Sequence, residues 1–123
     1  LKTHQPDLVI IELGANDGLR GYSLTIFKRN LTELVTLAQK QKARVLLLGV
    51  RLPPNYGDRY ANAFHQVYFT VAKNKNTQLV PFFLEGVAGN NEYMQADQLH
   101  PNSPAQPLIS NNVLPTVLSI LGE

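Results

Sequence analysis

The segment LVIIELG, residues 8–14, is a nearly continuous run of β-branched and aliphatic side chains that ends at a glycine. Such a run is typical of a strand buried on both faces of a parallel sheet. Residues 44–50 repeat the pattern, and a shorter run follows at residues 78–83. Pro81 lacks a backbone N–H group, so the third run is predicted to end early or to lie at an edge.

Between these runs the apolar residues recur every three or four positions, which predicts helices. The first stripe comprises Leu24, Phe27, Leu31, Leu34, Val35 and Ala38, and the second comprises Tyr60, Phe64, Val67, Tyr68 and Val71. A third helix is predicted to begin with Ser103 as N-cap, Pro104 at the first helical position and Gln106 completing a capping box. Strands and helices that alternate in this way predict an α/β fold with a parallel sheet.

The composition excludes several classes of protein. The 123 residues are 44% hydrophobic and 16% charged, which is ordinary for one globular domain. The net charge is only +2 and the Lys and Arg residues are scattered, which argues against nucleic-acid binding. No cysteine is present, so disulfides, thiolate metal sites and a cysteine nucleophile are excluded. No apolar run approaches the roughly 20 residues of a membrane span.

Parallel sheets bind ligands at the carboxyl ends of their strands. Three predicted loops lie at this edge: residues 14–23, 51–57 and 84–102. The first begins GANDGLRG, residues 14–21, and its three glycines let the backbone approach a ligand closely. Asn16 offers an amide donor that can stabilise a developing oxyanion. The alternative is a structural loop in which Asn16 and Asp17 only satisfy backbone groups.

The last loop contains DQLHPN, residues 97–102. Pro101 favours an extended backbone at His100, and the three-residue spacing can bring Asp97 to one ring nitrogen of His100. The other ring nitrogen would then be free to act as a general base. The alternative is a surface loop in which Asp97 caps a turn and His100 is merely exposed.

Other candidates for chemistry are weaker. Ser23 fails the Gly-x-Ser-x-Gly pattern of a nucleophile elbow, and the remaining serines are explained by the last helix. His4 lies at a chain end and His65 in a predicted helix, and both are assigned to packing or solvent exposure. Three separated histidines form no metal site. Tyr60 and Phe64 could line an acyl groove but belong more readily to a core. We predict no metal and no cofactor.

The two loop motifs together resemble those of the SGNH (GDSL) hydrolases. GAND resembles the Gly-x-Asn-Asp block of that family, and DQLHP resembles its Asp-x-x-His-Pro block, in the expected order. The segments RLPPNYG, residues 51–57, and PFF, residues 81–83, are also similar. This resemblance implies a three-layer αβα, flavodoxin-like parallel sheet of order 2-1-3-4-5. Residues 1–123 would be its C-terminal portion, with about three strands and three helices.

The resemblance also implies an activity. The protein would be an ester or thioester hydrolase of acylhydrolase, arylesterase or lysophospholipase type, periplasmic or secreted, working through a Ser-His-Asp acyl-enzyme mechanism. His100 would be the general base, Asp97 its orienting acid and Asn16 an oxyanion donor. The implied positions for binding a small acyl ester or thioester are Gly14, Asp17, Gly18, Leu19, Arg20, Leu52, Pro53, Asn55 and Tyr56.

The Gly-Asp-Ser block that carries the nucleophile in this family, and the second family block, have no counterpart in residues 1–123. We therefore expect these residues to be a partial domain whose sheet is completed by an N-terminal segment of the same protein. Alone, the residues would have an open strand edge and no activity. Three alternatives remain: a non-catalytic flavodoxin-like module that binds a small ligand, a carbohydrate deacetylase of the same family, and an inactive fragment with no biological role.

Overall fold

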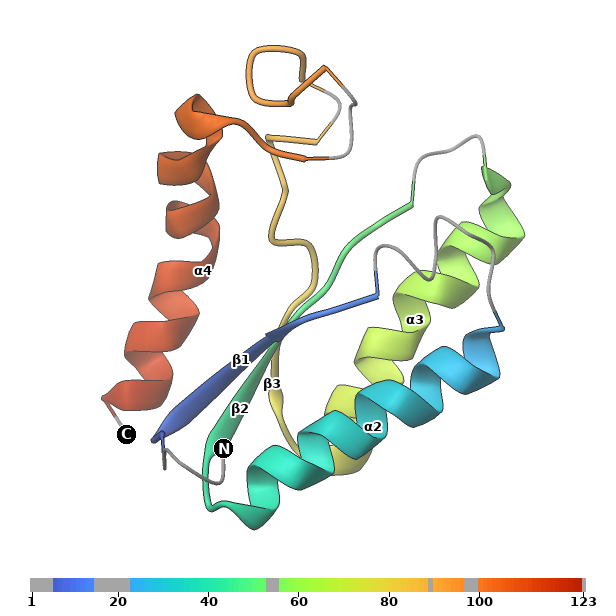
Figure 1. Cartoon of the computed structure of the whole chain (residues 1–123), viewed down its shortest axis with the longest axis vertical. Helices are drawn as coiled ribbons and strands as arrows, with labels where there is room; N and C mark the ends of the chain where they lie inside the picture. Colours follow the sequence, from blue (N-terminus) through green and yellow to red (C-terminus); the bar gives the residue numbers. More distant parts are fainter. Residues whose placement is uncertain (1–5, 15–22, 53–55, 89, 97–99, 123) are drawn as a thin grey trace. The chain divides into compact units, whose positions relative to one another are not determined.

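The computed structural model describes residues 6–14, 23–52, 56–88, 90–96 and 100–122. The chain forms two compact units, Leu1–Pro81 and Phe82–Glu123. The first unit holds a parallel sheet with two helices, and the second holds a loop region and one long helix (Figure 1). Within the described residues, no helix combines the length and the apolar character needed to cross a membrane.

Three parallel strands form the sheet of the first unit: β1 (Leu8–Glu12), β2 (Arg44–Leu48) and β3 (Gln78–Val80). Their order is β1-β2-β3, and the register places Leu8 opposite Arg44. Four of the five β2 residues are buried, whereas Ile10 on β1 is 46% exposed. The α/β fold with parallel strands that the sequence predicts is confirmed.

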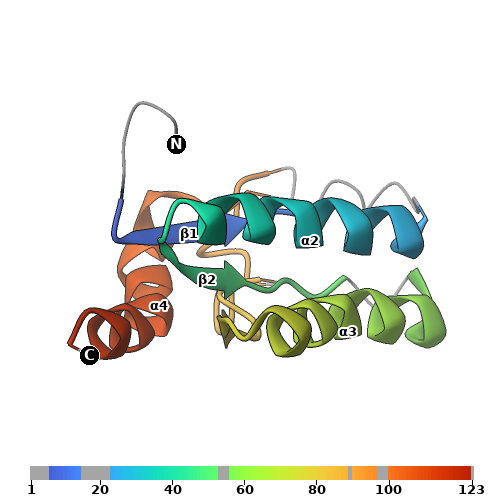
Figure 2. The same cartoon turned by 90° about the horizontal axis from the view of Figure 1, so that it is seen from below.

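Two helices, α2 (Leu24–Lys40) and α3 (Asp58–Lys75), lie side by side against one face of the sheet (Figures 1 and 2). The buried residues of α2 are Phe27, Leu31, Val35 and Ala38, and those of α3 are Phe64, His65, Val67, Tyr68, Val71 and Ala72. Both predicted stripes are therefore confirmed in their centres. Leu34, predicted as part of the first stripe, is instead 39% exposed because it lies at the margin of the buried face.

The strands are shorter than the apolar runs that predict them. The early end predicted for the third run is confirmed: β3 ends at Val80, since the next residue, Pro81, has no N–H group with which to continue the ladder. The Val80 carbonyl accepts a hydrogen bond from the Gly49 amide at 2.8 Å, and His65 Nε2 lies 2.8 Å from the Pro81 carbonyl oxygen. A carbonyl oxygen only accepts, so this Nε2 carries the proton. His65 is 8% exposed, and its predicted role in packing is confirmed.

The second unit has a small apolar core. A 3-10 turn, η2 (Ser103–Ala105), leads directly into α4 (Gln106–Leu121). The buried residues of this apolar core are Val87, Met94 and Ala105, with Leu84, Tyr93, Leu108 and Ile109 packed against them. Asn112 on α4 donates hydrogen bonds to the carbonyl oxygens of Phe83 and Glu85 at 3.0 and 2.8 Å, which attaches the helix to the loop region.

The predicted cap of the last helix is wrong. Ala105 precedes α4 and makes no side-chain cap hydrogen bond. The side-chain cap lies at the preceding 3-10 turn, where Asn102 is extended and its Oδ1 accepts from the Ala105 amide at 3.2 Å. Ser103 instead lies within the 3-10 turn that precedes α4. Gln106 reaches back as expected but donates to the Asn102 carbonyl at 3.3 Å, so the contact differs from that of a capping box.

Candidate active site

The first candidate loop leaves the sheet at Gly14, immediately after β1. Gly14 is buried and has a φ of +115°, a backbone conformation that favours glycine. A Cβ atom at this position would collide with the Phe27 ring and lie 2.7 Å from the Tyr68 hydroxyl oxygen. Glycine is therefore required here both by conformation and by space.

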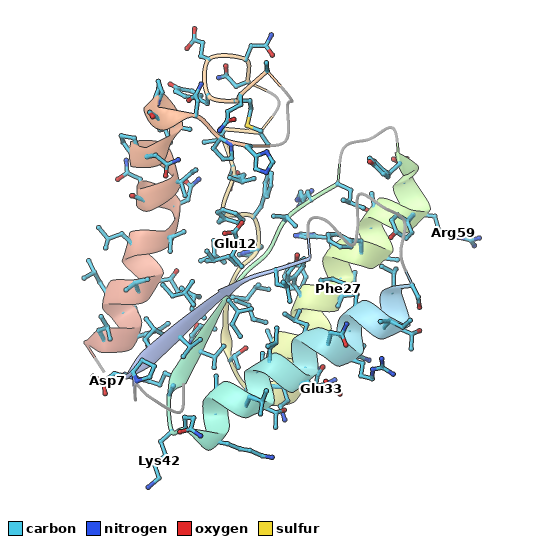
Figure 3. The ribbon with its side chains drawn as sticks, viewed as in Figure 1. Asp7, Glu12, Phe27, Glu33, Lys42 and Arg59 are labelled. Carbon is cyan, nitrogen blue, oxygen red and sulfur yellow. The ribbon has the colours of Figure 1, made fainter. Side chains whose placement is uncertain are left out.

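An aromatic cluster packs beneath this exit from the sheet. The Phe27 and Phe64 rings stack with centroids 5.1 Å apart, and Tyr68 meets both rings edge-on at 5.6 and 5.7 Å. Each of the three side chains is at most 1% exposed. Phe27 reaches the cluster from α2, while Phe64 and Tyr68 belong to α3 (Figure 3).

One hydrogen bond joins this cluster to the strand end. The buried Tyr68 hydroxyl donates to the Leu13 carbonyl oxygen at 2.7 Å. A buried hydroxyl and a strand-end carbonyl both need a partner, and here each satisfies the other. The backbone at residues 13–14 is therefore held by both packing and a hydrogen bond, two residues before Asn16.

Glu12 lies at the carboxyl end of β1, beside this exit (Figure 3). Its side chain is exposed, but nearby protein atoms exclude part of the solvent from the carboxyl group. This desolvation raises the pKa of Glu12 above its ordinary value. The sequence assigns Glu12 only to a strand. Its charged side chain within an aliphatic run is the signal that sets it apart.

Besides Gly14, two positions of the predicted substrate groove are described. Leu52 is 8% exposed, so its side chain is part of the core of the first unit. Tyr56 is half-buried and lies just before α3. The other predicted positions lie outside the described residues: Asn16, Asp17, Gly18, Leu19, Arg20, Pro53, Asn55 and Asp97.

The second candidate loop carries His100, whose side chain is exposed. The backbone around it is closed by hydrogen bonds: the Gln95 amide donates to the His100 carbonyl at 2.7 Å, and Gln95 Nε2 donates to the Pro101 carbonyl at 3.1 Å. Met94 and Pro101 form an antiparallel bridge. His100 is thus presented to solvent from a fixed backbone.

Asn102 makes several hydrogen bonds near His100 that the sequence does not predict. Its Nδ2 donates to the Glu92 carbonyl at 2.9 Å and to the Met94 carbonyl at 3.5 Å, and its backbone amide donates to the Tyr93 carbonyl at 2.9 Å. The sequence predicts Tyr68 only as part of a helix stripe and assigns no role to Asn102. Their hydrogen-bond partners lie outside the three- or four-residue spacing of a local pattern, so the sequence does not reveal these contacts.

The described candidate residues are divided between the two units. Gly14, Leu52 and Tyr56 belong to the first unit, and His100 belongs to the second. Over the residues that the structure describes, no three His, Cys, Asp or Glu side chains are grouped so as to hold a metal ion. An exposed imidazole can act as a general base.

Comparison with known proteins identifies relatives along the whole chain. The model of the GDSL-like lipase/acylhydrolase family matches residues 1–106. The chain is 51% identical over 121 residues to esterase TesA of Pseudomonas aeruginosa, covering 98% of this chain and 60% of that protein. It is 43% identical over 111 residues to thioesterase 1/protease 1/lysophospholipase L1 of Escherichia coli, covering 90% and 53% of the two proteins.

A solved structure agrees with these sequence relatives. The crystal structure of TesA superposes with a TM-score of 0.94 at 50% identity, covering 97% of this chain and 66% of that chain. The chain therefore spans a little over half the length of the two relatives, 60% and 53% respectively.

Proposed function

The chain belongs to the GDSL-like lipase/acylhydrolase family, and we propose that it supplies part of the reaction centre of an ester or thioester hydrolase. One observation carries this proposal: the chain is 51% identical over 121 residues to a protein named an esterase. His100, exposed on a loop with a fixed backbone, supports it from the structure.

In this proposal His100 is the general base of acylation. It takes the proton from a serine hydroxyl as the serine oxygen attacks the acyl carbon of the substrate. Asp97 orients the imidazole and stabilises the positive charge that forms on it. His100 then returns the proton to the departing alcohol or thiol, which leaves an acyl-enzyme. Water, activated by the same imidazole, releases the acid.

Asn16 is proposed to stabilise the tetrahedral intermediate. Its side-chain amide would donate to the oxyanion, where negative charge develops only during reaction. Gly14 supports this role because it gives the backbone a turn directly after β1, two residues before Asn16. Asp17, Gly18, Leu19 and Arg20 would form the adjoining wall of the acyl site. Leu52, Pro53, Asn55 and Tyr56 would belong to a second wall.

The serine nucleophile is proposed to come from a Gly-Asp-Ser segment of the same protein, outside residues 1–123. That segment would add the first strand of the sheet along the edge of β1. Among the described residues β1 pairs only with β2, and Ile10 and Leu13 are 46% and 41% exposed. Amide hydrogen exchange in the full-length protein tests this: β1 amides on the outer edge should be protected, and rapid exchange there would contradict it.

Small acyl oxyesters and thioesters are the proposed substrates, and the proposed location is periplasmic or secreted. The relative from Escherichia coli is named both a thioesterase and a lysophospholipase, which supports an acyl group attached to either sulfur or oxygen. Comparing hydrolysis rates on a short acyl thioester and the matching p-nitrophenyl ester would establish the preference. Cell fractionation tests the location.

The experiment that tests the general base compares two histidine variants of the full-length protein. His100→Ala should abolish hydrolysis of short p-nitrophenyl esters and leave the melting temperature nearly unchanged, because the side chain is exposed. His65→Gln should lower the melting temperature but keep turnover at low temperature, because His65 is buried in the first unit. Undiminished turnover by His100→Ala would overturn the proposal.

A further inference from the structure

We propose that Asn102 is a positioning residue for His100: its side-chain amide fixes the loop backbone that carries the imidazole. This inference rests on the proposed function, in which His100 is the general base. It assigns to Asn102 a role in the reaction rate that is separate from its role as a helix cap.

The first observation is the direction of the Asn102 hydrogen bonds. The Nδ2 group donates to the carbonyl oxygens of Glu92 and Met94, at 2.9 and 3.5 Å. The backbone amide of Asn102 donates to Tyr93 at 2.9 Å. Asn102 therefore attaches the chain after His100 to three consecutive residues that precede it, and these bonds close the loop at its base.

The second observation is that the same loop is closed again next to His100. The His100 and Pro101 carbonyls accept from the backbone amide and side chain of Gln95, at 2.7 and 3.1 Å. Met94 and Pro101 pair in the antiparallel bridge. The Asn102 hydrogen bonds align residues 92–94 with the chain that follows His100, and the Gln95 contacts depend on this alignment. Loss of the Nδ2 donors should therefore move the His100 backbone.

The third observation separates positioning from capping. The cap uses Oδ1, which accepts from the Ala105 amide at 3.2 Å, whereas the loop contacts use the Nδ2 hydrogens. Asn102→Asp keeps an acceptor that caps helices well and replaces the donor group with an oxygen facing two carbonyl oxygens. Asn102→Ser keeps a capping hydroxyl and removes the donors without adding a charge.

Asn112 offers a matched control in the same unit. Its Nδ2 also donates to two backbone carbonyls, those of Phe83 and Glu85, at 3.0 and 2.8 Å. Asn112→Asp makes the same chemical change, but neither Phe83 nor Glu85 belongs to the His100 loop. This variant measures how the loss of two such donors changes the stability of the unit while the His100 loop keeps its hydrogen bonds.

The experiment measures kcat, KM and melting temperature of Asn102→Asp, Asn102→Ser and Asn112→Asp in the full-length protein, with His100→Ala in parallel. Small displacements of a catalytic group have large effects on rate, so kcat should fall about tenfold to a hundredfold in both Asn102 variants, with KM within about twofold. Asn112→Asp should lower the melting temperature and keep the wild-type kcat.

Two results would overturn the inference. One is a wild-type kcat in Asn102→Ser, which would mean that the donors do not matter and that any loss in Asn102→Asp comes from its charge. The other is an equal loss of kcat in Asn112→Asp, which would indicate general destabilisation. His100→Ala distinguishes the two proposals: if that variant is fully active, the proposed function fails first.

Discussion

The two regions that carry the candidate residues are held in place by different forces. The strand end at residues 13–14 rests on three fully buried aromatic rings and one hydrogen bond, from Tyr68 to Leu13. The described region around His100 has a small apolar cluster, with Val87, Met94 and Ala105 buried, and hydrogen bonds from side chains to backbone carbonyls join its segments. Substitutions in the first region should therefore change stability, and substitutions in the second should change rate.

Phe27→Ala in the full-length protein should give the largest loss of stability and so tests the packing half of the comparison. Phe27 is 1% exposed and contacts both other rings of the cluster. Removing a buried phenyl ring costs about 3–5 kcal/mol through lost burial and the cavity left behind. Urea unfolding measures this; a loss below about 1 kcal/mol would mean that the cluster does not hold the strand end.

Gly14→Ala should be the next most damaging. The new Cβ would collide with Phe27, and the φ of +115° strains any residue other than glycine. Strain and overpacking together should lower the free energy of unfolding by about 2–4 kcal/mol. Gly57→Ala is the control, because its φ is also positive, at +86°, but nothing lies within 4 Å of an added Cβ. Equal losses in the two variants would show that collision contributes nothing.

Tyr68→Phe isolates the single hydrogen bond of the strand end. The ring remains, so the stacking should persist, but the Leu13 carbonyl loses its donor at 2.7 Å. Leu13 is 41% exposed, so the loss should be that of one ordinary hydrogen bond, about 0.5–1.5 kcal/mol. If the strand end needs only packing, this variant will unfold at the same urea concentration as the wild type, and the comparison between the regions becomes sharper.

Glu12→Gln should have the smallest effect, and its sign depends on pH. Desolvation raises the pKa of Glu12 in the folded state, so the folded protein binds this proton more tightly than the unfolded chain does. The charged carboxylate therefore destabilises the fold at pH values above the raised pKa. Glu12→Gln should melt slightly higher than the wild type at neutral pH. The difference should vanish below the ordinary carboxyl pKa, and a lower melting temperature at neutral pH would contradict the assignment.

Local patterns predicted the strands and helices but not the contacts that support the site. The aliphatic run of β1 and the apolar stripe through Phe27 and Leu31 are patterns of neighbouring residues, and the strand and the helix are both confirmed. The predicted burial of the strand on both faces is wrong for the described chain, in which no β1 residue is buried. The bond from Tyr68 to Leu13 joins residues 55 positions apart, and such pairing leaves no trace in a short window. At the start of the last helix, Asn102 and Ser103 both favour capping, and only the backbone conformation distinguishes them.

The candidate site was predicted from short sequence motifs, not from the periodic spacing of apolar residues. His100 and Gly14 are described, and their exposure and backbone conformation suit the roles assigned to them. Asn16 and Asp97 lie outside the described residues, so their roles remain predictions. Asn102 shows why motif reading is incomplete: its contacts with residues 92–94 depend on how the loop closes, which the spacing of Asp97 and His100 does not encode.

The most direct test of the account is the rate at which a p-nitrophenyl phosphonate labels the full-length protein, followed by intact mass and p-nitrophenol release. A phosphonate that reacts with the nucleophile leaves a stable tetrahedral adduct, so the reaction reports the activated serine without turnover. The account predicts one adduct per polypeptide with loss of esterase activity, and labelling slowed at least about a hundredfold by His100→Ala. Equally fast labelling of His100→Ala, or no adduct on an active wild-type protein, would contradict it.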